Sequence, residues 1–280
     1  MVIVFKYAFV GDEPARCRDL AYNCSLISPV RIDVAPRCET ELFRSGSVSL
    51  KLASRLLYGE DIRALVPLES LEEYLPQVLS GFFFYTAMLR GEPAHLTYPV
   101  DYPDRNAAYY GYERWGVYLT DQLAVGLRTL VNSMTLAATF LVGLQATRHV
   151  GSKRDAIAIY KAMIADAWAS LLEDVYVNCK QRWSYDIPDT PADQTELRQL
   201  CQRVLAFENY VLARCRGYIL EVLASGKEDV QIAIARSLKK IAYTDSEVEA
   251  ALETLTHADH IAVRRAGEEA LAHLRSTQCA

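Results

Sequence analysis

The chain has 280 residues, 51% of them hydrophobic and 23% charged, and its formal net charge is −5. A chain of this length and composition can bury a large core, as globular proteins do. Its acidic balance and the lack of any Lys/Arg-rich run disfavour general nucleic-acid binding, which depends on cations that face the phosphates. The seven cysteines form no Cys-x-x-Cys pair, and this pattern favours a reduced, cytoplasmic setting.

Residues 1–67 are predicted to form a small α/β segment. Val2–Val10 is rich in β-branched and aromatic residues, as a buried strand would be, and Val30–Val34 alternates like a second strand. Asp12 is expected to cap a helix between them. A helix over 47–58 and a third short strand over 62–66 would complete this segment.

Residues 68–225 are predicted to form an antiparallel bundle of long helices. Apolar residues recur at steps of three and four over most of this region. The turns between the longer segments are short, which forces consecutive helices to lie antiparallel. The predicted helices are 68–90, with a kink or a break at Pro76, then 107–149, 152–183 and 190–225.

The helix over 190–225 has the clearest signals in the chain. Thr190 is suited to the N-cap, Pro191 to the first helical position, and Asp193 to the acidic position three residues after the cap. Eight apolar residues then follow on one face, and Ser225-Gly226 provides the stop. We therefore expect one long helix that leads from the bundle into the C-terminal part.

The most apolar stretch, Leu130–Ala146, has two interpretations. A membrane span needs about twenty consecutive apolar residues. This stretch is shorter and contains five polar side chains, at Asn132, Ser133, Thr135, Thr139 and Gln145. We therefore predict a buried central helix of the bundle and no membrane span.

Residues 226–280 contain an internal repeat with an offset of 33 residues, a period typical of helical solenoids. Val230–Leu238 aligns with Val263–Leu271. Here the sequence resembles HEAT-like repeats, including the variety found in phycobilin lyases, over roughly its last seventy residues. The first copy departs from the family, with Gln231 where Arg is usual. The resemblance implies helix pairs stacked on the bundle, in a scaffold, an assembly factor or a chromophore-attaching enzyme.

Two aromatic loops are the candidate binding surfaces. Tyr and Trp offer large contact areas with a polar tip, so such clusters can anchor a partner or stack a flat ligand. The alternative is that the rings only pack against the end of the bundle. The first loop contains Tyr98, Tyr102, Tyr109, Tyr110, Tyr112 and Trp115, and the second contains Trp183 and Tyr185.

Other chemistry has weaker support in the sequence. Cys17 lies in the helix after the first strand, as a reactive thiol could in a thioredoxin-like or glutathione-transferase fold. Val66-Pro67, followed by Glu69-Ser70, is similar to the cis-proline and Glu-Ser of that transferase family, but the hairpin that should separate them is missing. Glu92 and His95 have the spacing of a di-iron motif, yet it occurs once and beside Pro93, so no metal site is predicted.

These patterns favour a mainly α protein with a small α/β start, a helical bundle and C-terminal HEAT-like helix pairs. The expected function is non-catalytic protein binding, as a scaffold, adaptor, assembly factor or chaperone, without a cofactor. The partner would be another protein, and a homo-oligomer is possible. The alternative is an enzyme, either a bilin-type chromophore lyase or a glutathione-transferase-like thiol enzyme.

Overall fold

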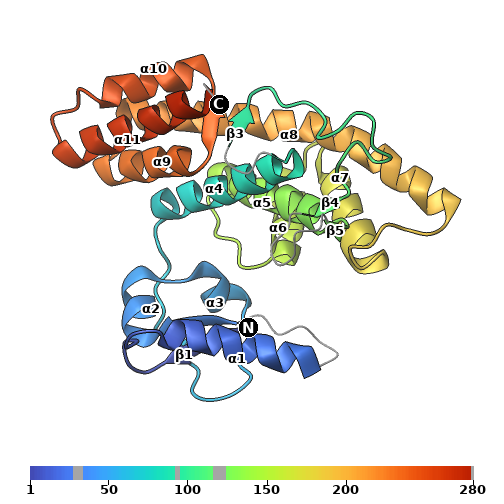
Figure 1. The fold of residues 1–280 in the computed structure, drawn as a ribbon, viewed down its shortest axis with the longest axis horizontal. Helices are drawn as coiled ribbons and strands as arrows, with labels where there is room; N and C mark the ends of the chain where they lie inside the picture. Colours follow the sequence, from blue (N-terminus) through green and yellow to red (C-terminus); the bar gives the residue numbers. More distant parts are fainter. Residues whose placement is uncertain (28–33, 92–94, 116–123, 279–280) are drawn as a thin grey trace. The chain divides into compact units, whose positions relative to one another are not determined.

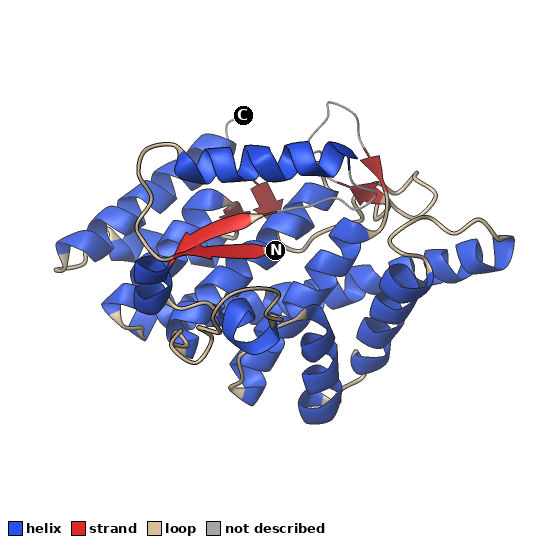
Figure 2. Cartoon of the chain, turned by 90° about the horizontal axis from the view of Figure 1, so that it is seen from below, coloured by secondary structure: helices blue, strands red, loops and turns tan. Residues whose placement is uncertain are grey.

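The computed structural model describes residues 1–27, 34–91, 95–115 and 124–278, and it is mainly helical, as predicted (Figures 1 and 2). The α-helices are α1 (Glu13–Ile27), α2 (Glu39–Ser45), α3 (Val48–Ala53), α4 (Leu71–Leu89), α5 (Arg128–Ala146), α6 (Lys153–Ile159), α7 (Ala169–Asp174), α8 (Pro191–Ser225), α9 (Glu228–Lys240), α10 (Ser246–Leu255) and α11 (Ile261–Gln278). Two π-helical stretches are η1 (Tyr160–Ile164) and η2 (Val175–Arg182). The short strands are β1 (Val2–Phe5), β2 (Ala35–Cys38), β3 (His95–Thr97), β4 (Arg114–Trp115), β5 (Ala124–Val125) and β6 (Ala242–Thr244).

The chain divides into two compact units. The first unit comprises Met1–Ser70 and Val150–Ser152, and the second comprises Leu71–His149 and Lys153–Ala280. In the first unit β1 pairs with β2 in parallel, with Val2 opposite Ala35, and α1 connects the two strands. A parallel pair needs such a crossover, so this order agrees with the predicted α/β start.

Several elements of the first unit differ from the prediction. The first strand ends at Phe5, and most of the predicted strand 30–34 lies outside the described residues. The predicted strand over 62–66 is wrong, because these residues form turns. Lys51 explains this local structure, since its ammonium donates hydrogen bonds to three backbone carbonyls of the turns, at 2.6–3.4 Å. The helix predicted over 47–58 is shorter in the structure. α3 ends at Ala53, because the backbone of Ser54 is extended.

In the second unit α4 packs against α5, and most of α5 is buried. The sequence predicted a kink or a break at Pro76, and α4 continues through Pro76 as one helix, so there is no break. The hydroxyl of Ser237 in α9 donates to the carbonyl of Pro76 at 3.2 Å. Among the described residues α5 is the one helix long and apolar enough to cross a membrane. This is weak evidence for a membrane span, because the core helix of a globular protein passes the same test. In α5, 72% of the apolar window is buried.

The predicted helix 107–149 is wrong over 107–115, and residues 116–123 lie outside the described residues. Residues 107–113 form turns, β4 follows, and the helix begins only at Arg128. Tyr110 and Gly111 have φ angles of 59° and 83°, which take the backbone out of the right-handed helix. A Cβ on Gly111 would lie 2.7 Å from the backbone nitrogen of Asp104, so this turn requires glycine.

The predicted helix 152–183 is also wrong as a single element. It consists of α6, η1, α7 and η2, with an interruption between η1 and α7. Ala165 has a φ of 51° at this interruption. The carboxylate of Asp166 accepts hydrogen bonds from the Tyr160 hydroxyl and the Trp168 amide, both at 2.9 Å. Side-chain bonding of this kind gives the backbone an alternative to the helical ladder.

The predicted helix 190–225 is confirmed as α8, a single helix of 35 residues. The Thr190 hydroxyl accepts from the Asp193 amide at 3.2 Å, as the cap required. Eight apolar residues at the predicted spacing line its inner face: Leu197, Leu200, Val204, Phe207, Val211, Cys215, Tyr218 and Val222.

The C-terminal helices pack as pairs, which confirms this part of the predicted fold class. α9 packs against α11 and α4, while α10 packs against α11 and α8. One contact was not predicted: β3 pairs in parallel with β6, so that residues 95–97 lie beside 242–244. Phe83 of α4 also stacks on Tyr243 of β6, with ring centres 5.0 Å apart. The second unit therefore contains both the bundle and the C-terminal helices.

Candidate functional site

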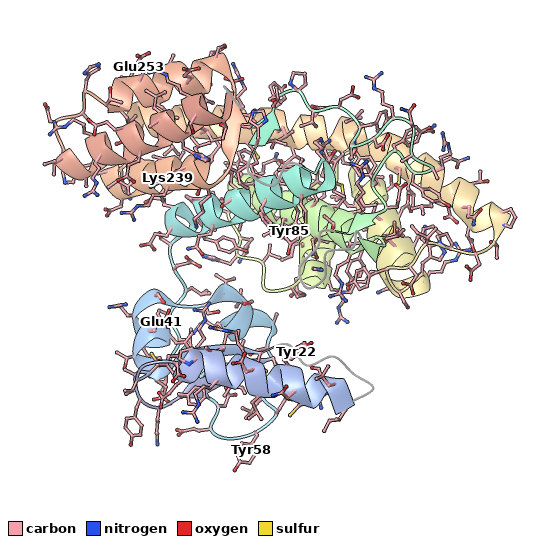
Figure 3. The ribbon with its side chains drawn as sticks, in the orientation of Figure 1. Tyr22, Glu41, Tyr58, Tyr85, Lys239 and Glu253 are labelled. Atoms are coloured by element: carbon pink, nitrogen blue, oxygen red, sulfur yellow. The ribbon has the colours of Figure 1, made fainter. Side chains whose placement is uncertain are left out.

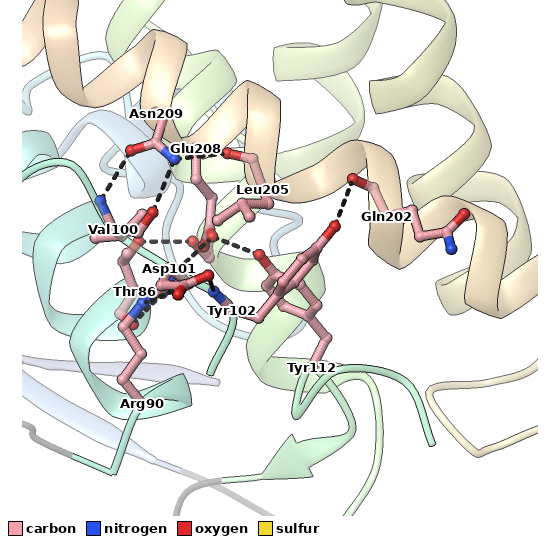
Figure 4. Close-up of polar contacts among 11 residues, drawn as sticks. Thr86, Arg90, Val100, Asp101, Tyr102, Tyr112, Gln202, Leu205, Glu208 and Asn209 are labelled. Atoms are coloured by element: carbon pink, nitrogen blue, oxygen red, sulfur yellow. Dashed lines mark hydrogen bonds and ion pairs between the residues drawn. The ribbon is translucent and has the colours of Figure 1, made fainter. Parts of the chain in front are cut away.

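Three rings of the first aromatic loop pack along α8, and Figure 4 shows two of them, Tyr102 and Tyr112. The Tyr102 ring stacks on Tyr110 with centres 4.6 Å apart, and it meets the edge of Tyr112 at 6.4 Å. Arg198 of α8 holds its guanidinium carbon 4.5 Å from the centre of the Tyr110 ring. Gln202 donates to the Tyr110 hydroxyl at 2.7 Å. Side chains of α8 therefore fix the position of this loop.

A buried carboxylate on α8 binds the first aromatic loop. Glu208 lies on α8 and is fully buried, and one of its oxygens accepts from Arg90 at 2.8 Å and from the Tyr112 hydroxyl at 2.7 Å. Arg90 also donates to the carbonyls of Thr86 and Asp101. Burial, and then the Glu208 charge, raise the pKa of Tyr112. Burial alone would lower the pKa of Arg90, but the Glu208 carboxylate outweighs it, and the pKa is raised.

Asn209, the next residue on α8, bonds to the backbone of the loop. Its amide oxygen accepts from the Val100 nitrogen, and its amide nitrogen donates to the Val100 carbonyl, both at 2.9 Å (Figure 4). Adjacent residues of one helix thus bind the loop, Glu208 through the Tyr112 hydroxyl and Asn209 through two amide hydrogen bonds.

The second aromatic loop has a different environment. Trp183 is buried, with the Arg182 guanidinium carbon 5.6 Å from its ring centre. The Tyr185 ring lies close to two cations, with the guanidinium carbon of Arg128 at 5.2 Å and the ammonium of Lys153 at 5.7 Å from its centre.

The two aromatic loops meet through the backbone at residues 126 and 127. The Gly126 amide donates to the Glu113 carbonyl at 2.7 Å, and the Leu127 amide donates to the Tyr185 carbonyl at 2.6 Å. The two aromatic loops are therefore neighbours in the second unit.

The remaining predicted site residues are spread out. Tyr98 is half-buried, with its ring centre 6.5 Å from that of Tyr243. Tyr109 is half-buried, and burial raises its pKa. The backbone of Trp115 in β4 pairs with that of Ala124. The structure thus places most of these rings against protein groups, and their role in binding stays a prediction.

Buried thiols and polar atoms lie near these loops. Burial raises the pKa of Cys201, and of Cys179 to about 12, so both thiols stay protonated near neutral pH. Three buried side-chain atoms near the loops have no hydrogen-bond partner: an oxygen of Glu113, an oxygen of Glu208 and the indole nitrogen of Trp183. None of these features supplies an activated nucleophile.

The thiol-enzyme and metal motifs gain no geometric support. Cys17 is half-buried in α1, and the peptide bond between Val66 and Pro67 is trans. Glu92 lies outside the described residues. Within residues 1–27, 34–91, 95–115 and 124–278, no group of three or more His, Cys, Asp or Glu side chains could hold a metal ion.

Sequence reasoning missed Arg90, Glu208 and Asn209. One signal was present for Glu208, because it lies four residues after Val204 and three before Val211, on the apolar face of α8. A charged residue at such a position is a candidate for a buried ion pair. Comparison with protein-family models, curated proteins and solved structures found no match for this chain.

Proposed function

We propose that the chain is a non-catalytic protein-binding factor, an adaptor or assembly factor, whose principal contact surface lies on its first unit. The observation that carries this proposal is the distribution of exposed apolar side chains. Most of the exposed large apolar side chains belong to described residues of the first unit. The most exposed have exposed fractions of 75–97%: Tyr7, Val10, Ile27, Leu57 and Tyr58. The described residues of the second unit, although far more numerous, expose four: Val125, Met163, Val177 and Ile261.

Large exposed apolar side chains are unfavourable in water, and where they gather they mark interaction sites. Figure 3 shows Tyr58 projecting from the loop after α3. Residues 1–70 carry nine Lys or Arg and nine Asp or Glu, so the first unit has no net charge with which to attract a partner. The partner would therefore be a protein that offers apolar side chains, bound by burial rather than by charge.

The aromatic loops and the C-terminal helix face remain secondary candidate contacts. The rings of Tyr102, Tyr110 and Tyr112 are already packed or hydrogen-bonded within the second unit. The protonated thiols near them also favour binding over thiol catalysis.

The test compares two double variants of the full-length, affinity-tagged chain. Leu57→Ser with Tyr58→Ser should reduce capture of a stoichiometric protein partner at least about tenfold, since it removes roughly two buried apolar side chains from the interface. Met163→Ser with Val177→Ser makes the same chemical change in the second unit and should leave capture unchanged. Capture should also vary little between low and high salt, because the first unit offers no net charge to be screened.

Two outcomes would contradict the proposal. Equal capture by the Leu57/Tyr58 variant and the native chain would exclude this surface. Visible absorbance from a bound pigment in the purified protein would favour the chromophore-lyase alternative. A partner that proves to be a second copy of the chain, detected by sedimentation, would identify the protein as a homo-oligomer.

A further inference from the structure

Three cations lie on neighbouring elements of the second unit, where α6 and η2 both pack against α5. Arg128 is the first residue of α5, Lys153 is the first residue of α6, and Lys180 belongs to η2. Arg128 and Lys153 both lie within 6 Å of the centre of the Tyr185 ring. Lys180 holds its ammonium 4.7 Å from the centre of the Tyr176 ring and donates to that hydroxyl at 3.2 Å.

The three charges repel one another. Burial, followed by the charges of Lys180 and Arg128, lowers the pKa of Lys153 from 10.5 to about 8. The Lys153 ammonium donates to the side-chain oxygen of Asn132, which bears no charge. Within the described residues this is the one hydrogen bond of the Lys153 ammonium, so two of its N–H groups remain for another acceptor.

Two other cations of the second unit pair with carboxylates. Lys161 pairs with Glu173 at 2.7 Å, and Arg182 pairs with Glu196 at 2.9 Å and also with Asp193. Within the part of the chain that the structure describes, neither Lys153 nor Lys180 forms an ion pair with Asp or Glu.

We infer that Lys153, Lys180 and Arg128 bind a phosphate group beside the Tyr185 ring. A phosphate carries almost two negative charges near neutral pH and accepts several hydrogen bonds, which suits the ammonium groups of Lys153 and Lys180. The N-terminus of α5 adds to the attraction, because Arg128 opens a helix whose first turn contains no acid. The Tyr185 ring offers a flat face on which the organic part of a phosphorylated ligand could stack.

This site does not depend on the proposed function, because its residues lie in the second unit and the apolar surface lies in the first. It also gives Tyr185 a specific role in ligand binding, which the sequence predicted only in general terms.

The test measures binding of inorganic phosphate and pyrophosphate to the full chain by calorimetry at pH 7, with ionic strength held constant by chloride. We expect saturable binding of either phosphate probe and none of chloride. Lys153→Met and Lys180→Met should each weaken phosphate binding by about tenfold or more, the effect of losing a charge-assisted hydrogen bond. Each variant should also raise the melting temperature without phosphate, because one repelling charge is gone.

Lys161→Met is the matched control, since it removes a lysine of the same region that already has a carboxylate partner. Its phosphate affinity should equal that of the native chain. Raising the pH from 7 to 9 should weaken binding to the native chain, because Lys153 loses its proton near pH 8. Absence of phosphate-specific binding by the native chain, or undiminished binding by both Lys153→Met and Lys180→Met, would overturn the inference.

Discussion

Glu208 is the residue on which the position of the first aromatic loop most depends. It is fully buried on α8 and accepts hydrogen bonds from Arg90 and Tyr112, two residues that lie far from it in the sequence. An ion pair buried in this way stabilises a fold only while both partners are present. Removal of the carboxylate would leave the half-buried guanidinium of Arg90 without a counter-charge.

We expect Glu208→Gln to lower the free energy of unfolding by about 3–5 kcal/mol, because it leaves the Arg90 charge uncompensated while keeping the side-chain volume. Urea denaturation measures this change. The control is Arg105→Gln, which breaks the exposed ion pair between Arg105 and Asp101 and should have no measurable effect. A loss no larger than that of the control would show that the Arg90–Glu208 pair does not support the fold.

At the scale of single residues, the sequence predicted the aromatic residues but not the side chains of α8 that bind them. Clusters of Tyr are visible by composition, whereas the bonds from Asn209 to Val100 join residues that are 109 positions apart. Local patterns carry no information about such pairs. Glu208 is the exception, since its position among Val204, Phe207 and Val211 marks a charge inside an apolar face.

Secondary-structure elements were predicted correctly where local sequence signals determine them, and wrongly where side-chain contacts of the folded chain do. α8 was predicted with its ends because the Thr190 cap, the apolar spacing and Gly226 are all local signals. The helix 152–183 was predicted as continuous because neither Ala165 nor Asp166 breaks a helix by propensity. Its interruption depends on the bond between the Tyr160 and Asp166 side chains, which only the folded chain supplies.

Ala165 provides a test of this interruption. Its φ of 51° is unfavourable for a residue with a Cβ, so Ala165→Gly should raise the free energy of unfolding by about 0.5–1 kcal/mol. Ala206 lies exposed in α8, and Ala206→Gly should lower it by about 1 kcal/mol. Chemical denaturation of both variants checks the opposite signs. Destabilisation by Ala165→Gly would mean that the backbone there is helical in solution.

At the scale of the whole molecule, the C-terminal helices belong to the same compact unit as the bundle. α9 covers α4, Tyr243 stacks on Phe83, and β6 pairs with β3. The repeat pattern predicted the helix pairs, because each has its own apolar periodicity. It could not predict the strand pairing, since three-residue strands have no measurable period.

A chain that ends at Ser225 should therefore lose cooperative unfolding, because α4 and β3 would lose their partners. Circular dichroism during thermal denaturation would show a broad transition in place of a sharp one. A chain that begins at Leu71 is the comparison, and it should keep a sharp transition, since the second unit is compact by itself. A sharp transition of the chain that ends at Ser225 would mean that the C-terminal helices are a separable module.

The pairing of β3 with β6 also affects the order of events on the ribosome. Ala242 follows Thr97 by 145 residues, so the partner of β3 leaves the exit tunnel long after β3 itself. At about 5–20 residues per second this delay is roughly 7–30 s. During that interval the nascent chain presents an unpaired strand and the uncovered face of α4 to solvent, and a chaperone that shields both would improve the yield of native protein.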